Sequence, residues 1–134
     1  MVTEMVVKES LSEQMIAAGS ELIRRLDDAG LNVSGALWFY EPDSNYWRLI
    51  IVTAEVSAKG IKEVYREIQS VLRAIPEDKS IIGLSDISVV DSNDPLVSLL
   101  KVALKTGAGI SGIRFSRNIV NGTLIEDSYI YRLT

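Results

Sequence analysis

The chain has 134 residues, of which 47% are hydrophobic and 24% are charged, as is typical of a single globular domain, here residues 1–134. Its formal net charge is −4, which argues against general binding to the phosphates of nucleic acids. It contains no cysteine and no histidine, and this excludes disulfides, thiolate nucleophiles, Cys-ligated metal sites and histidine-based catalytic triads.

The first predicted element is a helix over roughly residues 11–29. Ser10 and Ser12 are both candidate caps, and Glu13 follows Ser10 at the spacing of a capping box. Gly30 is a natural helix stop. The apolar residues that recur at helical spacing are Leu11, Met15, Ala18, Leu22, Leu26 and Ala29.

Two strands, 33–40 and 46–56, are predicted around the turn residues 41–45. A five-residue loop pairs Tyr40 with Tyr46, and this register sets Trp38 opposite Arg48. The face that carries Trp38 and Arg48 is then expected to be open, while the other face, which carries Leu37, Phe39 and Trp47, is the core face. An exposed pair of this kind is suited to a cation–π contact.

A second helix is predicted to begin near Ser57 and to end before Pro76, because apolar residues follow a 3.6-residue period between them. A strand over about 84–90 comes next. Asp94 as the cap and Pro95 at the first helical position then predict a third helix that closes near Gly107.

The C-terminal stretch is predicted to form a hairpin around Asn121-Gly122, the residue pair that best tolerates a type I′ turn. The register places Val120 opposite Thr123, and Arg117 opposite Glu126. We interpret Arg117 and Glu126 as a structural ion pair, with a role as the floor of a site as the alternative. The core face is expected to carry residues such as Ile113, Phe115, Ile119, Leu124 and Ile130.

The stretch between the third helix and this hairpin, residues 107–112, matches the letters of G-x-G-x-x-G. A dinucleotide-binding loop leads from a strand into a helix, whereas this one leads from a helix into a strand. We interpret it as a helix end followed by a bend, with an anion-binding nest of backbone N–H groups as the alternative.

This order of elements, α-β-β-α-β-α-β-β, predicts an α+β fold in a single domain. Its antiparallel or mixed sheet has about five strands, and the three helices lie on one face of that sheet.

The function that the sequence favours is non-catalytic binding or assembly, with a homodimer formed through the open sheet face or an edge strand. Aromatic and arginine side chains are the ones enriched at binding hot spots. We therefore predict a binding surface made of Arg114, Ser116, Asn118, Asp127, Tyr129, Trp38 and Arg48. We expect no cofactor, no metal and no nucleic-acid partner, and the lack of a signal-like or membrane-spanning run predicts a cytoplasmic location without membrane contact.

An alternative function is the binding of an anionic small molecule, or metal-assisted hydrolysis, at a site made of Arg114, Asn118, Asp127 and Tyr129. Arginine is the side chain best suited to a carboxylate or phosphate. A hydrolase would need a hard cation such as Mg²⁺, for which the candidate ligands are Asp86, Asp91 and Asp127.

Overall fold

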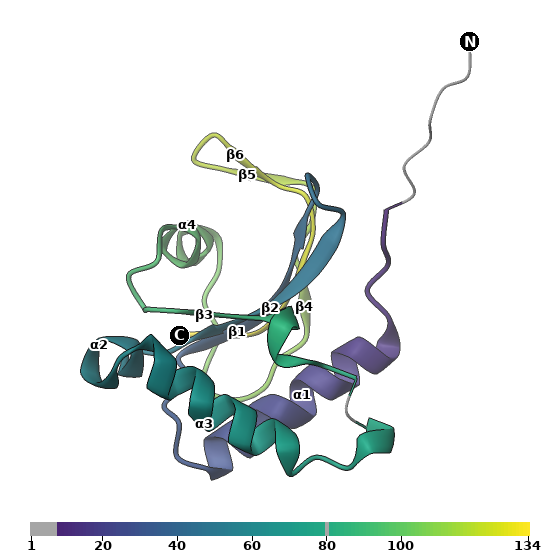
Figure 1. Ribbon diagram of the computed structural model, residues 1–134. Helices are drawn as coiled ribbons and strands as arrows, with labels where there is room; N and C mark the ends of the chain where they lie inside the picture. The colour runs from purple at the N-terminus through teal and green to yellow at the C-terminus, as the bar shows by residue number, and fades with distance from the viewer. Residues whose placement is uncertain (1–7, 80) are drawn as a thin grey trace.

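The computed structural model describes residues 8–79 and 81–134, and its architecture is the α+β fold that the sequence predicted. A five-stranded mixed sheet has the strand order β3-β2-β1-β7-β4, and two further strands, β5 and β6, form a small separate sheet (Figure 1). Only the β2–β3 pair is parallel; the other three pairs of the main sheet are antiparallel. Among the described residues, no helix is long and apolar enough to cross a membrane.

Helix α1 (Glu13–Asp28) begins after Ser12, whose Oγ accepts a hydrogen bond from the backbone N–H of Met15 at 3.1 Å. Of the two predicted caps, the structure therefore uses Ser12. The buried residues Leu22, Ile23 and Leu26 form the stripe that faces the sheet. Gly30 follows with φ 83°, a left-handed conformation that favours glycine and ends the helix.

Strands β1 (Gly35–Glu41) and β2 (Tyr46–Val52) pair through Glu41 and Tyr46, so the loop between them has four residues instead of the predicted five. This one-residue shift moves each side chain of β1 to the opposite face relative to the side chains of β2. Trp38 pairs with Leu49 and is buried, whereas Phe39 pairs with Arg48. The predicted contact between Trp38 and Arg48 is therefore wrong, because the two side chains lie on opposite faces of the sheet.

The predicted second helix is two helices, α2 (Glu55–Lys59) and α3 (Ile61–Arg73), separated by Gly60 with φ 87°. Ser57 consequently lies inside α2 and caps neither helix. Two short 3₁₀ helices, η1 (Glu77–Lys79) and η2 (Leu84–Asp86), lead to β3 (Ile87–Val90).

Helix α4 (Pro95–Ala103) begins where the sequence predicted. The Asp94 carboxylate accepts hydrogen bonds from the backbone N–H groups of Leu96 and Val97, at 3.0 and 3.3 Å. The helix ends before Gly107, and residues 107–112 then run beside β7, where the Ser111 N–H donates to the Tyr131 carbonyl at 2.7 Å. The glycine-rich stretch is thus a bend that enters a strand, as the sequence predicted, but it does not end the helix, because α4 ends at Ala103 with Leu104 as its C-cap.

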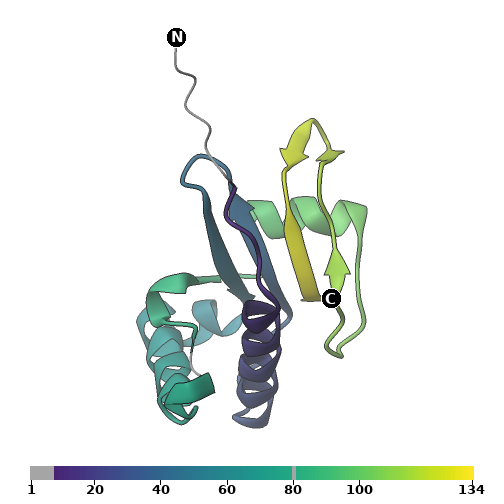
Figure 2. The ribbon, with the colours of Figure 1, turned by 90° about the vertical axis from the view of Figure 1, so that its right-hand side faces the viewer.

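The C-terminal stretch contains β4 (Ile113–Arg114), β5 (Asn118–Val120), β6 (Thr123–Ile125) and β7 (Ser128–Leu133). Both halves keep the predicted register: Ile113 pairs with Ile130, and Val120 pairs with Thr123. Between them Arg117 adopts φ 52°, and the chain bends so that β5 and β6 project from the main sheet as a separate arm (Figure 1). Figure 2 shows this arm at the end of the long hairpin that β4 and β7 begin. Residues 117–126 are called the hairpin arm below.

The bend reverses the buried face of the hairpin arm. Val120 and Ile125 are buried against α4, while Ile119 and Leu124, which the sequence placed on the core face, are 72% and 57% exposed. Strict alternation of faces fails because a residue with positive φ interrupts the strand.

The helices cover both faces of the main sheet, and this differs from the one-face arrangement that the sequence suggested. Helices α1 and α3 pack on one face, around Trp38, Leu49 and Tyr131. Helix α4 and the hairpin arm pack on the other face, around Leu37 and Ile130 (Figure 1).

Trp38 and Tyr131 join the sheet to α1. The Trp38 indole N–H lies 3.0 Å from the Tyr131 hydroxyl, which in turn donates to the Ile16 carbonyl at 2.6 Å. Burial raises the pKa of Tyr131, so this hydroxyl keeps its proton and remains a donor. A Cβ atom placed on Gly19 would lie 2.3 Å from the same hydroxyl, so the close approach of α1 requires glycine.

We predict that Gly19→Ala lowers the free energy of unfolding by about 1–3 kcal/mol, because the new methyl group overpacks the contact with Tyr131. In an exposed helix the same change raises the free energy of unfolding by up to about 1 kcal/mol. A decrease would therefore by itself indicate the contact with Tyr131. Urea denaturation measures the difference. The control Gly107→Ala, whose Cβ would meet nothing within 4 Å, should change stability by less than about 0.5 kcal/mol. Equal effects of the two variants would contradict the contact.

Candidate functional site

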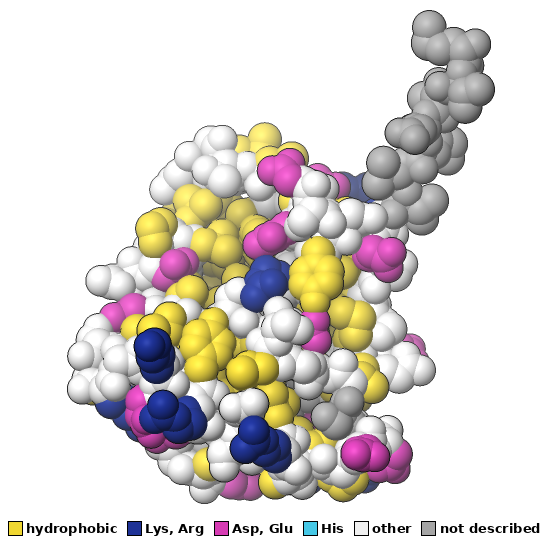
Figure 3. Space-filling view, viewed as in Figure 1, with side chains coloured by type: hydrophobic (Ala, Val, Ile, Leu, Met, Phe, Trp, Pro, Cys, Tyr) yellow, Lys and Arg dark blue, Asp and Glu magenta, His cyan; other side chains and the backbone are white. Residues whose placement is uncertain are grey.

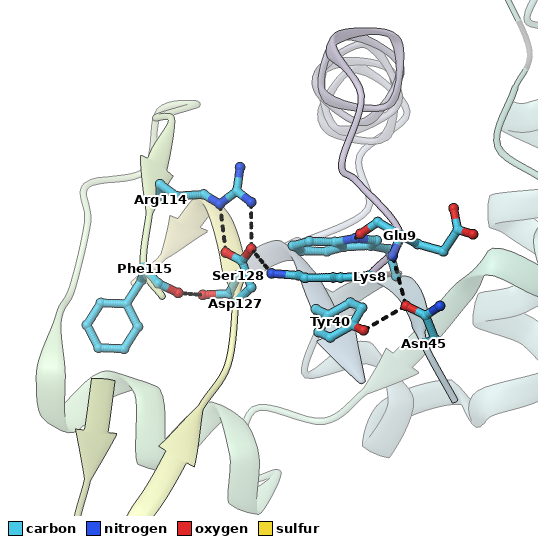
Figure 4. A network of polar contacts seen from close by, with 9 residues as sticks. Lys8, Glu9, Tyr40, Asn45, Arg114, Phe115, Asp127 and Ser128 are labelled. Atoms are coloured by element: carbon cyan, nitrogen blue, oxygen red, sulfur yellow. Dashed lines mark hydrogen bonds and ion pairs between the residues drawn. The ribbon is translucent and has the colours of Figure 1, made fainter. Parts of the chain in front are cut away.

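Asp127 lies at the centre of a polar network on the sheet face that also carries α1. Arg114 binds it through two parallel contacts, Nε to Oδ1 at 2.7 Å and Nη2 to Oδ2 at 2.6 Å (Figure 4). The Lys8 ammonium group reaches Oδ2 from the other side at 2.5 Å. The carboxylate therefore accepts three charge-assisted hydrogen bonds, from residues that are distant in the sequence.

Two aromatic rings support the cations of this network. The Lys8 Nζ lies 4.7 Å from the centroid of the Tyr40 ring and 5.6 Å from that of Trp47. The Arg114 guanidinium carbon lies 5.5 Å from the centroid of Trp47. These distances are within the range of cation–π attraction.

The segment that carries Lys8 is held against the β1–β2 hairpin by hydrogen bonds. The Trp47 indole donates to the Glu9 carbonyl at 2.8 Å, and the Glu9 N–H donates to Asn45 Oδ1 at 2.8 Å. The Tyr40 hydroxyl donates to the same Asn45 oxygen at 2.7 Å (Figure 4). The position of Lys8 over the rings therefore depends on the turn between β1 and β2.

The electrostatic balance of the network is positive, since two cations share one carboxylate. Asp127 is only 3% exposed, and burial alone would raise its pKa, but the hydrogen bonds and charges of Arg114 and Lys8 outweigh burial and lower it. The hydrogen bond to Asp127 also raises the pKa of Arg114. The Arg114 and Lys8 side chains are 47% and 39% exposed, so part of each cation faces solvent.

Arg114, Asp127 and Tyr129 are the predicted site residues that the structure brings together. Tyr129 is the cross-strand partner of Arg114 between β4 and β7, and it lines a groove of about 390 Å³ beside α1. Asn118 and Ser116 lie apart from this cluster, where the Asn118 amide donates to the Ser116 carbonyl at 2.9 Å.

The two predicted site residues of the first hairpin do not join the cluster. Trp38 is buried under α1. Arg48 instead donates to the Ser88 hydroxyl at 2.6 Å and to the Ile87 carbonyl at 3.1 Å on β3. An open sheet face that carries both residues is therefore not formed.

The predicted side-chain ion pair between Arg117 and Glu126 is also absent within the described part of the chain. The two residues meet through their backbones, where the Arg117 N–H donates to the Glu126 carbonyl at 3.1 Å. The positive φ of Arg117 turns its side chain away from the regular position of a strand residue.

The three carboxylates considered for a metal ion each contact different partners. Asp127 binds Arg114 and Lys8, Asp86 accepts from Tyr46, and Asp91 accepts from Ser57. In residues 8–79 and 81–134, no group of three or more acidic side chains is placed to hold a metal ion. The site thus offers nothing that favours metal-assisted hydrolysis.

Lys8 and Trp47 belong to the network although the sequence did not indicate them as site residues. Lys8 and Asp127 are 119 positions apart, and no periodicity relates them. Trp47 was assigned to the core, and its side chain is indeed only 3% exposed, yet it supports both cations.

Comparison of the chain with protein-family models, with curated proteins and with solved structures finds no match.

Asp127 should stabilise the fold only while it is ionised. Its pKa in the folded state lies below the ordinary value of 3.8, so its contribution is complete above that value and is lost as the pH falls through the lower folded pKa. We predict that Asp127→Asn destabilises the protein by about 1–3 kcal/mol at pH 7, because it leaves two cations without their counter-ion.

Urea denaturation of the protein and of Asp127→Asn at pH 7, 5 and 3 measures this contribution. The difference between them should be equal at pH 7 and 5 and smaller at pH 3. A control is Glu63→Gln, which breaks an exposed pair with Arg66 and should cost less than about 1 kcal/mol. A difference between the protein and Asp127→Asn that grows as the pH falls would contradict the assigned direction of the pKa.

Proposed function

We propose that the protein is a non-catalytic binding and assembly protein that associates with a second copy of itself through the hairpin arm. The observation that carries this proposal is the outward-facing pair Ile119 and Leu124, which are directly opposite each other in β5 and β6 and are 72% and 57% exposed. A cytoplasmic location stays a prediction from the sequence.

The hairpin arm has the form of a docking element because its inner face is anchored and its outer face is not. Val120 and Ile125 pack with α4 and the main sheet, so the arm has a defined position. Hydrophobic side chains gather over α4 and the arm on the face shown in Figure 3. An exposed apolar patch on an anchored element is typical of an interaction surface.

The charges beside the pair favour a second copy as the partner. Arg117 and Glu126 lie at the base of the arm, and neither side chain has an ion-pair partner among the described residues. In a two-fold symmetric contact, each surface meets its own copy, so Arg117 of one protomer approaches Glu126 of the other. The surface then complements itself in charge as well as in hydrophobicity.

The hairpin arm is proposed for assembly in place of the open sheet face that the sequence suggested. Both faces of the main sheet are covered by helices, so no broad open face is left for a partner. The arm, together with β4, one of the two edge strands of the main sheet, where Ile113 is 36% exposed, offers an accessible surface in this region.

We predict that Ile119→Thr combined with Leu124→Thr converts a dimer into a monomer and raises the dissociation constant at least about tenfold, since each change removes an apolar contact worth about 1 kcal/mol. Both replacements keep strand propensity on the exposed face. Size-exclusion chromatography with light scattering across a dilution series is the measurement. The control Ile61→Thr alters an exposed apolar residue on α3, which packs on the other face of the main sheet from the arm, and it should leave the dimer intact. A protein that is monomeric at every concentration would refute the proposal.

A charge exchange tests the symmetric contact more specifically. Arg117→Glu and Glu126→Arg should each weaken self-association, because like charges then meet across the two-fold axis. An equimolar mixture of the two variants restores opposite charges at both contacts, so it should form a heterodimer close in affinity to the original dimer. Failure of the mixture to associate, with both variants folded, would contradict the pairing of Arg117 with Glu126.

A second candidate function is the binding of a small anion by Arg114 and Lys8. The observation that favours it is the net positive balance of the network, in which two partly exposed cations share one carboxylate over aromatic rings. Arginine N–H groups that Asp127 does not use remain able to donate to a carboxylate or phosphate.

We expect phosphate or citrate to raise the melting temperature if this second function holds, and Arg114→Ala to abolish the increase. Differential scanning fluorimetry at constant ionic strength measures it, so that general salt effects are excluded. Arg66→Ala, which removes an exposed arginine on α3, is the matched control and should keep the full increase. An unchanged melting temperature with both anions would count against an anion site.

A further inference from the structure

A mostly apolar pocket of about 440 Å³ lies beside the network described above, on the other side of Trp47. Five parts of the chain line it: residues 9–10, the first turn of α1, Trp38 on β1, residues 45–47 at the start of β2, and residues 81–86 before β3. Its volume is within the range of small-molecule sites in proteins. Neither the proposed dimer contact nor the anion site uses it.

Aromatic rings and acidic groups define the chemistry of this pocket. Tyr46, which is 39% exposed, supplies most of the aromatic surface of its wall, and both tryptophans of the chain, the largely buried Trp38 and Trp47, reach the lining. The two charged residues of the lining are Glu9 and Asp86, both acidic, and the lining contains no lysine or arginine. On the face shown in Figure 3, hydrophobic and acidic side chains lie next to one another in this region.

Neither acidic group of the pocket is paired with a lysine or arginine among the described residues. Glu9 contacts the rest of the protein through its backbone, and its carboxylate points away from the hairpin (Figure 4). Asp86 accepts hydrogen bonds from the Tyr46 hydroxyl and from the Gly83 N–H, which fix its position without neutralising it. The hydrogen bond to Asp86 raises the pKa of Tyr46, so the phenol stays neutral and adds no negative charge of its own.

The protein already places a cation on one of these rings. Lys8 lies over Trp47 and Tyr40, and its charge is balanced by Asp127. Arg48, whose guanidinium lies 6.0 Å from the Tyr46 ring, is held by Ser88 and the Ile87 carbonyl on β3. Both cations are engaged outside the pocket, so the pocket's own negative charge has no cation within its lining.

We propose that this pocket binds a small organic cation, such as an alkylammonium or quaternary ammonium compound. The apolar part of the ligand would contact Tyr46 and the small exposed parts of Trp38 and Trp47, and its charged head would lie near Glu9 and Asp86. An aromatic wall with carboxylates at its border is the arrangement that selects a cation over a neutral molecule of the same shape. The site is independent of the hairpin arm, so this proposal and the proposed assembly stand or fall separately.

Choline and its neutral carbon isostere 3,3-dimethylbutan-1-ol are suitable probes, because they differ mainly in charge. Both tryptophans lie in the pocket wall, so intrinsic tryptophan fluorescence reports binding directly. We expect a saturable change with choline and a dissociation constant about tenfold lower than that of the alcohol. The choline affinity should fall as salt is raised, while that of the alcohol should not.

Two conservative variants locate the binding. Glu9→Gln should weaken choline binding about three- to fivefold, and Tyr46→Leu should weaken it about tenfold. Neither residue is buried, so both variants should fold. Glu77→Gln removes an exposed acidic group that is not part of the pocket, and it should leave choline affinity unchanged.

Three results would overturn the proposal. One is equal affinity for choline and the alcohol, which would describe a pocket without selectivity for charge. Another is the lack of any saturable fluorescence change with choline, tetramethylammonium or butylammonium up to about 50 mM, well above the dissociation constants of specific small-molecule sites. The third is choline binding that Glu9→Gln and Tyr46→Leu leave unchanged, since the site would then lie elsewhere.

Discussion

The close approach of α1 to the main sheet is the constraint on which the rest of the structure depends. Tyr131 donates its hydroxyl proton to the Ile16 carbonyl and lies within hydrogen-bond distance of the Trp38 indole, while Gly19 leaves the space that the phenol needs. This contact sets the height of α1 above β1 and β7. The N-terminal segment before α1 is thereby directed across the β1–β2 hairpin, and Lys8 is brought within reach of Asp127.

Trp47 links the two candidate sites, because its ring supports the cations of the network on one side and contributes to the pocket wall on the other. The network has a positive balance, whereas the pocket lining carries only acidic charges. Two sites of opposite charge can lie this close together because Asp127 neutralises one of the two cations, and the Trp47 ring separates the remaining cation from the acidic groups of the pocket. The two surfaces would thus select ligands of opposite charge.

The bend at Arg117 gives the C-terminal hairpin two roles. Before the bend, β4 belongs to the main sheet and carries Arg114. After it, β5 and β6 pack on α4 with their inner face and leave Ile119 and Leu124 exposed. A regular hairpin of the same register would have buried Ile119 and Leu124 and turned Val120 and Ile125 outward in their place.

The sequence by itself determined the elements whose signals are local. Asn121-Gly122 specified the turn and register of the C-terminal hairpin, and Asp94-Pro95 specified the start of α4, since turn and cap preferences depend on a few adjacent residues. The α+β order and Arg114 with Asp127 as candidate residues also came from the sequence. Tertiary structure decided the rest: a one-residue shift buried Trp38, the positive φ of Arg117 exposed Ile119, and Lys8 met Asp127 across 119 positions. These outcomes depend on which faces pack together in three dimensions, and the pattern of residues along the chain does not specify that packing.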